Sequence, residues 1–389
     1  MSESRCIKPL HFVVLAPNDW RGQWTNRQHL FSRIGQDHAV LFSNGLWESW
    51  FKWTALKYSP WLGRCSREDN VWVYDAPALL LRFRRWPKVD CLVRKAGAIH
   101  LQKQVSKITH GAGKRVLYIC HPKFLEAVSD IPHDVLVYHA YDDFTSGNPE
   151  SDLSQREQTL LTRADHIFAS SALVAERFRQ RSGRDDVIFL PNGVDYSEFA
   201  RADYPSPAIL ASIPSPRVGY IGSINSKIDL PLLLALTERV PDCSFVFVGR
   251  VNNLDIRQRQ QWHSLLARPN VRWFDRQSRM DMPAITTAMD LCALYYDTNE
   301  EQFGAACYPL KLHEALAAGK PVVSSDIEAV RGFQPTVTIA HGVSDWVDQI
   351  RHGLQEADDP SLIQQRQSIA QNNRWRHRVE RILRTINAS

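Results

Sequence analysis

The stretch Tyr308–Val323, YPLKLHEALAAGKPVV, contains one helix and the start of the strand that follows it. Pro309 suits the first turn of a helix, where its missing N–H costs nothing. Gly319 can end the helix, and Pro321 prevents its continuation. The apolar pair Val322-Val323 then begins a buried strand. This stretch therefore predicts a helix-to-strand unit of an α/β protein.

Short apolar runs recur on both sides of this unit and alternate with helix-like stretches such as Asn26–Ile34 and Ser154–Arg163. The runs are rich in Val, Ile, Phe and Tyr and are apolar on both faces, which is typical of buried parallel strands. The predicted strands are His11–Ala16, Ala39–Ser43, Val71–Tyr74, Val116–Ile119, Val135–His139, Ile167–Ala169, Val187–Leu190, Val218–Ile221, Phe245–Val248, Val271–Phe274, Leu291–Tyr295, Val322–Ser324 and Val337–Ile339. Such alternation predicts doubly wound sheets.

The length of 389 residues predicts two domains. The alternation breaks at Ala202–Pro216, where four prolines indicate a linker, and then restarts. We therefore predict an N-terminal domain over residues 1–203 and a C-terminal domain over residues 204–370. Because ligands bind at the carboxyl ends of strands in open α/β sheets, we expect the two sheets to face a ligand cleft.

The composition is that of a soluble globular protein, with 44% hydrophobic and 23% charged residues. The seven cysteines form no C-x-x-C pair, which indicates reduced thiols in a cytosolic protein. No metal-ligand spacing is present. The polar segment Met1–Pro9 lacks a signal core, and no apolar run is long enough to span a membrane.

Two features of the first half indicate a membrane surface or another anionic partner. Between Leu81 and Arg115 stand ten basic residues and one acid, Asp90. Upstream, tryptophans gather with other apolar residues and with Lys52 and Lys57, as at a bilayer interface. The tryptophans are Trp47, Trp50, Trp53 and Trp61. A solvated helical face and a packed aromatic core are the alternatives.

Two motifs of the second half suit a nucleoside diphosphate. Gly222-Ser223 directly follows a predicted strand, so backbone amides can approach a phosphate there. The fingerprint G-x-G-x-x-G is absent. Lys311 and Glu314 are three residues apart and share a helix face. A cation at a helix start can neutralise a diphosphate, and a carboxylate one turn later can accept hydrogen bonds from ribose hydroxyls. An ordinary strand-to-helix turn and a surface Lys–Glu pair are the alternatives.

The segment Tyr308–Val323 resembles the nucleotide-binding helix of GT-B glycosyltransferases, particularly family 4 and the related bacterial exopolysaccharide (glucuronosyltransferase-like) enzymes. Further segments resemble other parts of these enzymes in the same order, and the motif Arg27–Leu30 resembles a subgroup that makes surface polysaccharides. The further segments are Ala164–Ser171, Leu190–Asp195, Ser244–Arg250, Asn270–Phe274 and Asn373–Arg378. The resemblance implies two Rossmann-like domains facing a cleft, with a C-terminal helix in residues 371–389 that packs back on the N-terminal domain.

The resemblance also implies roles for individual residues in donor binding. Lys311 would hold the donor diphosphate and Glu314 the ribose, with Tyr308 in the same nucleotide-binding set. Gly222 and Ser223 would lie beside the phosphates. Three more residues complete the expected donor site: Arg250 would face the phosphates or the sugar, and Arg276 and Gln277 would line the base pocket.

The chemistry of transfer is less clearly implied. Retaining members of family 4 carry a second glutamate eight positions before the first, and here that position is Ala306. Glu301 begins a similar motif five residues too early, so a contact from Glu301 to the donor sugar and a retaining reaction stay an alternative. An inverting enzyme needs a general base near the acceptor. Asp142 and Asp143 follow the predicted strand Val135–His139 at the carboxyl edge of the sheet, and adjacent carboxylates can raise one another's pKa, which suits a base. We favour Asp142, with Asp143 second; their alternative role is to cap the next helix or to be solvated.

Together these features predict an inverting glycosyltransferase that moves a sugar from a UDP-sugar to a polyprenyl-diphosphate-linked saccharide in bacterial surface or exopolysaccharide synthesis. No cofactor or metal is required, because Lys311 and helix dipoles can carry the diphosphate charge. We expect a cytoplasmic protein bound peripherally to the inner membrane surface, without a nucleic-acid partner. A nucleotide-sugar epimerase and an inactive sugar-nucleotide-binding protein on the same fold are the further alternatives.

Overall fold

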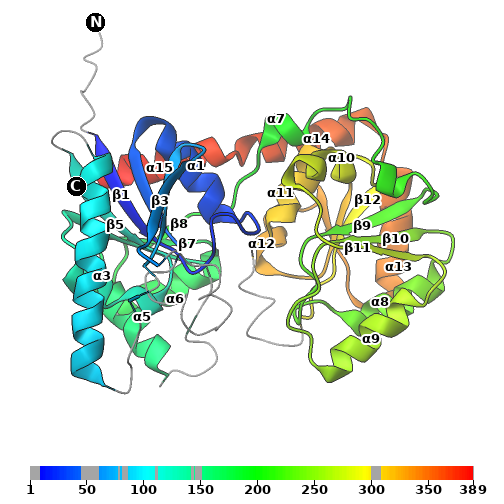
Figure 1. Cartoon of the computed structure of the whole chain (residues 1–389). Helices are drawn as coiled ribbons and strands as arrows, with labels where there is room; N and C mark the ends of the chain where they lie inside the picture. Colours follow the sequence, from blue (N-terminus) through cyan, green and yellow to red (C-terminus); the bar gives the residue numbers. More distant parts are fainter. Residues whose placement is uncertain are drawn as a thin grey trace, which may run out of the picture. The chain divides into compact units, whose positions relative to one another are not determined.

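The computed structural model of the chain describes residues 9–44, 61–77, 79–80, 86–109, 113–141, 144, 151–298 and 308–388. The chain forms two compact units (Figure 1). Unit 1 consists of Met1–Pro191 and Arg378–Ser389, and unit 2 consists of Asn192–His377. The division falls before the predicted linker, because Asn192 already bonds within unit 2: its Nδ2 donates to the Tyr308 carbonyl over 2.6 Å.

Unit 1 contains an eight-stranded sheet in the order β3-β4-β2-β1-β5-β6-β7-β8. The strands are β1 (Leu10–Leu15), β2 (Ala39–Ser43), β3 (Arg64–Glu68), β4 (Val71–Asp75), β5 (Lys114–Ile119), β6 (Val135–Ala140), β7 (His166–Ala169) and β8 (Ile188–Phe189). All pairs are parallel except β3 with β4. The central strands β1, β5 and β6 are buried almost throughout, which accounts for their apolar residues on both faces.

Strand β3 was not predicted from the sequence. Its residues Arg-Cys-Ser-Arg-Glu are mostly polar and partly exposed, and the strand pairs antiparallel at the edge of the sheet. An edge strand buries too little side-chain surface to show an apolar pattern, so its pairing with β4 could not be predicted from periodicity.

The helices of unit 1 connect the strands and confirm the doubly wound prediction. They are α1 (Asn26–Asp37), α3 (Pro87–Ile108), α4 (Ala127–Asp130), α5 (Asp152–Arg163) and α6 (Ala172–Ser182), with a 3-10 turn at Pro122–Phe124. Among the described residues, no helix combines the length and apolarity that crossing a bilayer demands.

Unit 2 contains a six-stranded, fully parallel sheet in the order β11-β10-β9-β12-β13-β14. The strands are β9 (Arg217–Ile221), β10 (Ser244–Val248), β11 (Val271–Phe274), β12 (Leu291–Leu294), β13 (Val322–Ser324) and β14 (Val337–Ile339). All six were predicted, with small differences at their ends. All are short, and most are apolar and buried, as expected of strands covered by helices on both faces; β11 at the edge contains the exposed Arg272.

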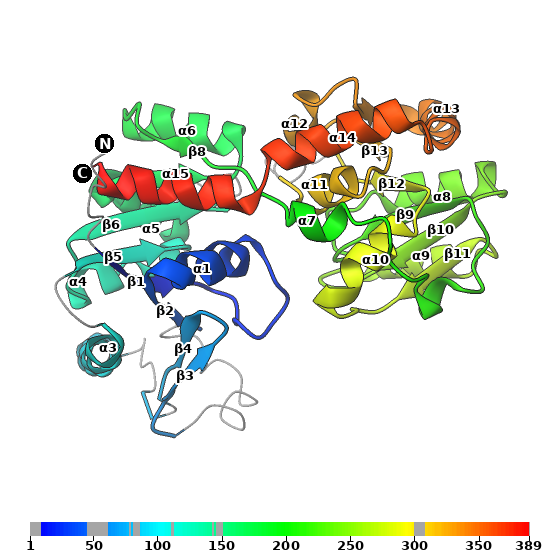
Figure 2. The same cartoon turned by 90° about the horizontal axis from the view of Figure 1, so that it is seen from above.

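Two helical layers cover this sheet. Helices α8 (Leu230–Arg239), α9 (Ile256–Leu266) and α13 (Gly342–Gln355) pack on one face through a shared apolar core. Helices α10 (Met282–Thr287), α11 (Leu310–Ala317) and α14 (Pro360–Asn372) lie on the opposite side in Figure 1 and are in front in Figure 2. The remaining short elements are α7 (Tyr196–Phe199), α12 (Glu328–Arg331) and 3-10 turns at Ala208–Leu210 and Arg279–Asp281.

The last helix, α15 (Trp375–Asn387), begins in unit 2 and ends in unit 1, to which residues from Arg378 onward belong. Arg378 Nε donates to the Pro191 carbonyl over 3.0 Å within unit 1. In unit 2, Val194 N–H donates to the Asn373 carbonyl over 3.0 Å. The returning C-terminal helix therefore follows the expectation from the sequence.

Candidate functional site

Two glycines lie where β9 and β10 end in unit 2. Gly222 has φ +151° and Gly249 has φ +147°, a backbone conformation that side chains rarely adopt. A Cβ on Gly249 would overlap the carbonyl group of Gly222. Gly222 N–H donates to the Val248 carbonyl over 2.8 Å, which draws the two strand ends together. The predicted Gly222-Ser223 turn therefore lies at the carboxyl edge of the sheet, and Gly222 presents no side chain there.

Helix α11 places Lys311 against this turn. Pro309 is the N-cap of the helix, so Lys311 stands in its first turn. The Lys311 ammonium lies 3.6 Å from the centre of the Tyr220 ring and 5.6 Å from that of Tyr296. A Cβ on Gly222 would lie 2.7 Å from Lys311 Nζ. The ammonium therefore occupies space that is open only because residue 222 is a glycine. The structure thus brings together two predicted donor residues that are far apart in sequence.

Glu314 follows one turn later on the same helix face. It lines a small pocket with Lys311 and with residues of β9 and β12. Burial raises the pKa of Glu314 to about 7, and the Lys311 ammonium only partly opposes the rise. This carboxyl group therefore changes its protonation near neutral pH, which is unusual for a glutamate and typical of functional sites.

Tyr308 anchors the start of α11. Its hydroxyl lies 2.8 Å from His313 Nε2, and its carbonyl accepts the Asn192 bond. Both Tyr308 and His313 are buried, and His313 also packs edge-on against Phe333. These contacts give Tyr308 a positioning role at the head of the helix. His313 and Asn192 were not singled out from the sequence, although His313 stands between Lys311 and Glu314.

The other predicted donor residues follow the ends of the neighbouring strands. Arg250 is exposed directly after Gly249, at the end of β10. Arg276 is exposed and Gln277 is half-buried beyond the end of β11, where the Gln277 side chain donates to the Asp275 carbonyl over 2.9 Å. Trp273 of β11, which the sequence analysis did not identify, donates from Nε1 to the Gly249 carbonyl over 2.9 Å. Its indole is 37% exposed, so an aromatic surface accompanies these polar groups.

A larger pocket of about 420 Å³ lies at the carboxyl ends of β12, β13 and β14. Its walls include Asp229, Asp297 and Asp326, together with His341 and Trp346. Asp326 pairs with Arg331 over 2.6 Å, and burial raises the pKa of Asp229. Carboxylates accept hydrogen bonds from hydroxyl groups and repel phosphates, so this pocket suits neutral polar groups better than a diphosphate.

Three predicted residues lie outside the described part of the chain. They are the candidate bases Asp142 and Asp143 and the candidate sugar contact Glu301. The structure describes the strand that leads to the two aspartates, β6, up to Tyr141. There His139 is buried, and its Nδ1 lies 2.7 Å from the Tyr118 hydroxyl and 2.9 Å from the Tyr141 hydroxyl. Burial lowers the pKa of His139 well below its usual range, so the ring stays neutral and braces the strand end.

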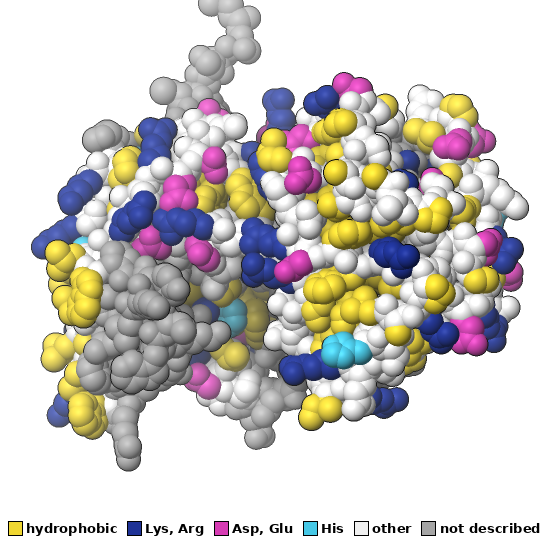
Figure 3. Space-filling model, turned by 45° about the vertical axis from the view of Figure 1, so that its right-hand side comes forward, with side chains coloured by type: hydrophobic (Ala, Val, Ile, Leu, Met, Phe, Trp, Pro, Cys, Tyr) yellow, Lys and Arg dark blue, Asp and Glu magenta, His cyan; other side chains and the backbone are white. Residues whose placement is uncertain are grey.

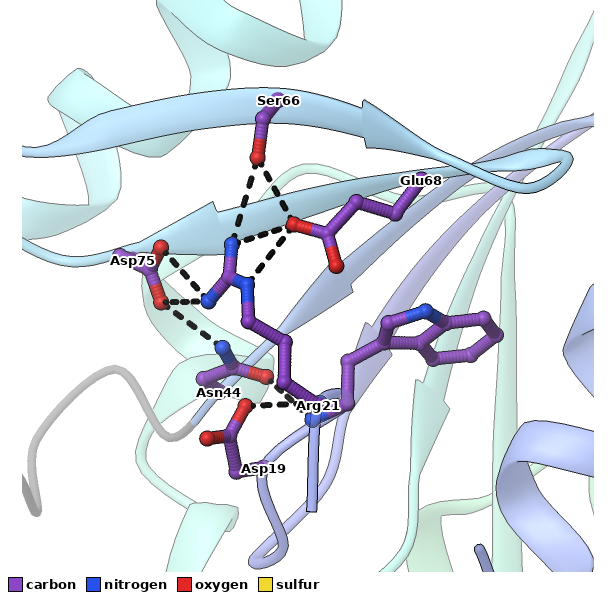
Figure 4. A network of polar contacts seen from close by, with 7 residues as sticks. Asp19, Arg21, Asn44, Ser66, Glu68 and Asp75 are labelled. Atoms are coloured by element: carbon purple, nitrogen blue, oxygen red, sulfur yellow. Dashed lines mark hydrogen bonds and ion pairs between the residues drawn. The ribbon is translucent and has the colours of Figure 1, made fainter. Parts of the chain in front are cut away.

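A polar network fixes the loop after β1 in unit 1 (Figure 4). The Arg21 guanidinium bonds to Glu68 over 2.6 Å, to Asp75 over 3.1 Å and to Ser66 over 3.2 Å. Asp75 also accepts from Asn44 Nδ2 over 2.7 Å. The network joins the loop to β3 and β4, so the unpredicted edge strand has a specific role in holding this side of the sheet.

Residues 215–356 match the family model described as Glycosyl transferases group 1. A curated relative, named as the teichuronic acid biosynthesis glycosyltransferase TuaH of Bacillus subtilis (strain 168), is 27% identical over 231 residues. That match takes in 57% of this chain, and this chain spans 57% of the length of the relative.

Solved structures of glycosyltransferases have a similar fold. Sucrose-phosphate synthase from Thermosynechococcus elongatus has a TM-score of 0.67 at 11% identity, over 96% of this chain and 97% of that one. WaaG, a glycosyltransferase involved in lipopolysaccharide biosynthesis, has a TM-score of 0.61 at 12% identity, over 96% and 98% of the two chains. At such identities the likeness shows the fold alone, and that fold is GT-B.

Proposed function

We propose that the chain transfers a hexosyl group from a nucleotide sugar to a saccharide acceptor in cell-surface polysaccharide synthesis. The match of residues 215–356 to the family model of group 1 glycosyl transferases supports this proposal. One observation carries the proposal: Lys311, in the first turn of α11, lies against the glycine turn at Gly222, and Glu314 follows on the same helix face. A cation, a glycine turn and a carboxylate at that spacing match the phosphates and ribose of a nucleoside diphosphate.

We propose UDP as the nucleotide part of the donor. Lys311 and the turn at Gly222-Ser223 would hold the diphosphate, with Arg250 beside the phosphates or the sugar. Glu314 would accept hydrogen bonds from the ribose, and Arg276 and Gln277 would border the base. Trp273 adds an exposed ring next to Gly249, on which a flat base can stack.

The acceptor is proposed to be a polyprenyl-diphosphate-linked saccharide, with unit 1 as the acceptor-binding domain. Support comes from the relative named for teichuronic acid biosynthesis and from the surface of unit 1 described below. Asp142 is proposed as the general base of an inverting reaction, with Asp143 second. The retaining alternative through Glu301 makes a product of opposite anomeric configuration, which NMR of the product distinguishes.

The outer face of α3 is the surface that supports a membrane-bound acceptor. Four lysines are exposed on this helix together with large apolar side chains, whereas its one acid, Asp90, is buried. The lysines are Lys88, Lys95, Lys103 and Lys107. Leu92 is 68% exposed and Ile99 is 54% exposed, one above the other at a spacing of seven residues. Apolar residues interleaved with lysines suit an anionic bilayer surface.

More exposed apolar side chains stand in the segment that precedes this helix in sequence. Trp61, Leu62, Leu79 and Trp86 are all more than half exposed. Gly63, next to Leu62, is held close to α3, because a Cβ on it would lie 3.0 Å from His100 Cε1. Hydrophobic and basic side chains share the left-hand margin of the molecule in Figure 3, the side on which Figure 1 shows α3. This concentration in unit 1 supports peripheral attachment to the inner face of the cell membrane from the cytoplasm.

Attachment predicts that Leu92→Glu with Ile99→Glu weakens binding to phosphatidylglycerol vesicles at least tenfold. Each buried apolar side chain contributes about 1.5–3 kcal/mol, and each lysine near an anionic surface about 1 kcal/mol. Ile256→Glu is the matched control, since Ile256 is 78% exposed but lies in unit 2. Vesicle co-sedimentation measures both, and equal binding by both variants contradicts the proposed surface.

The proposal includes no cofactor, metal or nucleic acid. In the described residues, no group of His, Cys, Asp and Glu side chains could hold a metal ion. Lys311 and the amino end of α11 supply positive charge for the diphosphate instead.

A thermal-shift panel of nucleotide sugars tests the function most directly, because a bound ligand stabilises the chain in proportion to ln(1 + [L]/Kd). We expect UDP and one UDP-sugar to raise the Tm, and radiolabel transfer to a lipid extract to follow. Conversion of the UDP-sugar without an acceptor would indicate an epimerase instead. UDP binding with no product from any extract would indicate an inactive binding protein.

A further inference from the structure

The side chain of Arg27 occupies the carboxyl edge of the sheet in unit 1. Arg27 stands in the first turn of α1, the helix that follows β1. Cys120 directly follows β5, and Tyr141 directly follows β6. Because β1, β5 and β6 are neighbours in the sheet, their carboxyl ends meet around this guanidinium.

The contacts of Arg27 within the described residues are with neutral groups. Its Nη1 donates to Asn18 Oδ1 over 3.2 Å, and its guanidinium carbon lies 4.2 Å from the centre of the Tyr141 ring. Its charge also partly opposes the rise that burial causes in the pKa of the Cys120 thiol. Arg27 Nε is buried and has no hydrogen-bond partner in the part of the chain that the structure describes. A buried N–H without an acceptor costs about 1–3 kcal/mol, a cost that the oxygen of a bound ligand would offset.

Arg21, on the preceding loop, provides a contrast. Its guanidinium is bound by two carboxylates, those of Glu68 and Asp75. Arg21 is therefore neutralised by its own unit, and it serves to hold the loop. In the described residues, Arg27 has no such carboxylate.

Arg27 acts on two histidines at this edge of the sheet. Burial, followed by the charges of Lys123 and Arg27, lowers the pKa of His121 to about 3. Burial and the charge of Arg27 likewise lower the pKa of His139. Both histidines are neutral at physiological pH, while Arg27 and Lys123 are cationic. Among the described residues, the charges that act on these histidines are thus cationic, which favours an anion.

We propose that Arg27 binds an oxyanion of the acceptor substrate, a phosphate or a carboxylate. The guanidinium is a planar fork that pairs with either group through two hydrogen bonds, and its partial exposure leaves one side open to a ligand. This inference rests on the proposed function, in which unit 1 binds the acceptor. It adds that the acceptor is recognised by its negative charge at the end of β1, and that Arg27 is a substrate-binding residue.

The test measures anion binding to the full chain saturated with UDP, which keeps the donor site occupied. Inorganic pyrophosphate and glucuronate are titrated separately by calorimetry into the wild-type chain and into Arg27→Gln. Arg33→Gln is the matched control, because Arg33 lies on the same helix and donates to the His29 carbonyl over 2.6 Å. Arg27→Lys keeps the charge without the fork, and thermal unfolding checks that every variant folds.

We expect the wild-type chain to bind at least one probe, and Arg27→Gln to bind it at least tenfold more weakly. Arg27→Lys should fall between them and Arg33→Gln should match the wild type. Binding of pyrophosphate alone assigns a phosphate, and binding of glucuronate alone assigns a carboxylate. Equal binding by Arg27→Gln and the wild type overturns the inference, as does binding of neither probe at millimolar concentration.

UDP affinity separates this inference from the proposed function. Arg27→Gln should bind UDP as tightly as the wild type, because the proposed donor residues lie in unit 2. A parallel loss of UDP binding would overturn the assignment of Arg27 to the acceptor. If the wild-type chain binds no UDP at all, the proposed function fails, and the same titration without UDP still measures the anion site.

Discussion

Replacing Lys311 by alanine should weaken UDP binding while leaving unit 2 folded. The Lys311 ammonium lies against Gly222, because a Cβ on this glycine would be only 2.7 Å from Nζ. A diphosphate seated on the glycine turn would therefore meet this ammonium directly. Alanine keeps the helix, because it has the highest helix propensity.

The expected loss follows from two opposing contributions. A hydrogen bond to a charged partner contributes about 1.5–3 kcal/mol. Without a ligand, the ammonium lies 3.6 Å from the Tyr220 ring centre, a cation–π contact of about 0.5–1 kcal/mol that a ligand partly replaces. The difference is about 2 kcal/mol, which corresponds to a roughly 30-fold rise in the Kd for UDP.

Isothermal titration of UDP into the wild-type chain and Lys311→Ala measures this change. Lys320→Ala is the control, because Lys320 follows the opposite end of α11. We expect the control to bind like the wild type. If Lys311→Ala binds UDP within about threefold of the wild type, the diphosphate does not lie at this helix start and the donor site is elsewhere.

Three further predictions concern the same reaction. The pKa of Glu314 is raised from 4.5 to about 7, so its burial costs no stability below about pH 4.5 and an increasing amount as the pH rises through 7. Glu314→Gln should therefore increase the free energy of unfolding relative to wild type more at about pH 8.5 than at about pH 5, by on the order of 2 kcal/mol because the side chain is half-buried. Thermal melts at the two pH values measure this change, and the same variant should weaken UDP binding. Gly222→Ala should weaken UDP binding at least tenfold and destabilise unit 2 by about 1–3 kcal/mol, because Gly222 has a positive φ and a Cβ there would crowd Lys311. Gly332→Ala is the control, because Gly332 has open space around it, and it should change neither quantity in the same titrations and melts. Asp142→Ala should abolish turnover in a radiolabel transfer assay while UDP binding stays intact, and normal turnover would exclude Asp142 as the base.

The sequence predicted the fold wherever a strand is buried on both faces, because such a strand needs apolar residues throughout. The inner strands of unit 2 and the central strands of unit 1 appear as apolar runs, because helices cover the sheets. Strand β3 escaped prediction because its stability comes from pairing with β4 and from the Arg21 network, not from an apolar pattern. The start of unit 2 was also predicted later than the structure has it, since the bond from Asn192 to Tyr308 is a tertiary contact.

The donor side and the acceptor side differ in how locally the sequence encodes them. Lys311 and Glu314 lie on one helix, so their spacing alone predicts a shared face, and only their contact with Gly222 required the structure. The contact between the Tyr308 hydroxyl and His313 Nε2 also could not be predicted from the sequence, because it depends on which side of α11 is buried.

On the acceptor side, Arg27, Cys120 and Tyr141 come from three segments that only the strand order β1-β5-β6 unites. A lone arginine after a strand has many ordinary explanations in sequence, and Arg21 exemplifies the commonest, a structural ion pair. What separates the two arginines is charge compensation: carboxylates hold Arg21, whereas neutral groups surround Arg27 among the described residues. A partly buried cation without a carboxylate partner among the described residues is better explained by a substrate than by stability, because burying charge without a partner lowers stability. Acceptor recognition by charge is therefore a property of the folded sheet edge, and it is tested independently of the nucleotide site.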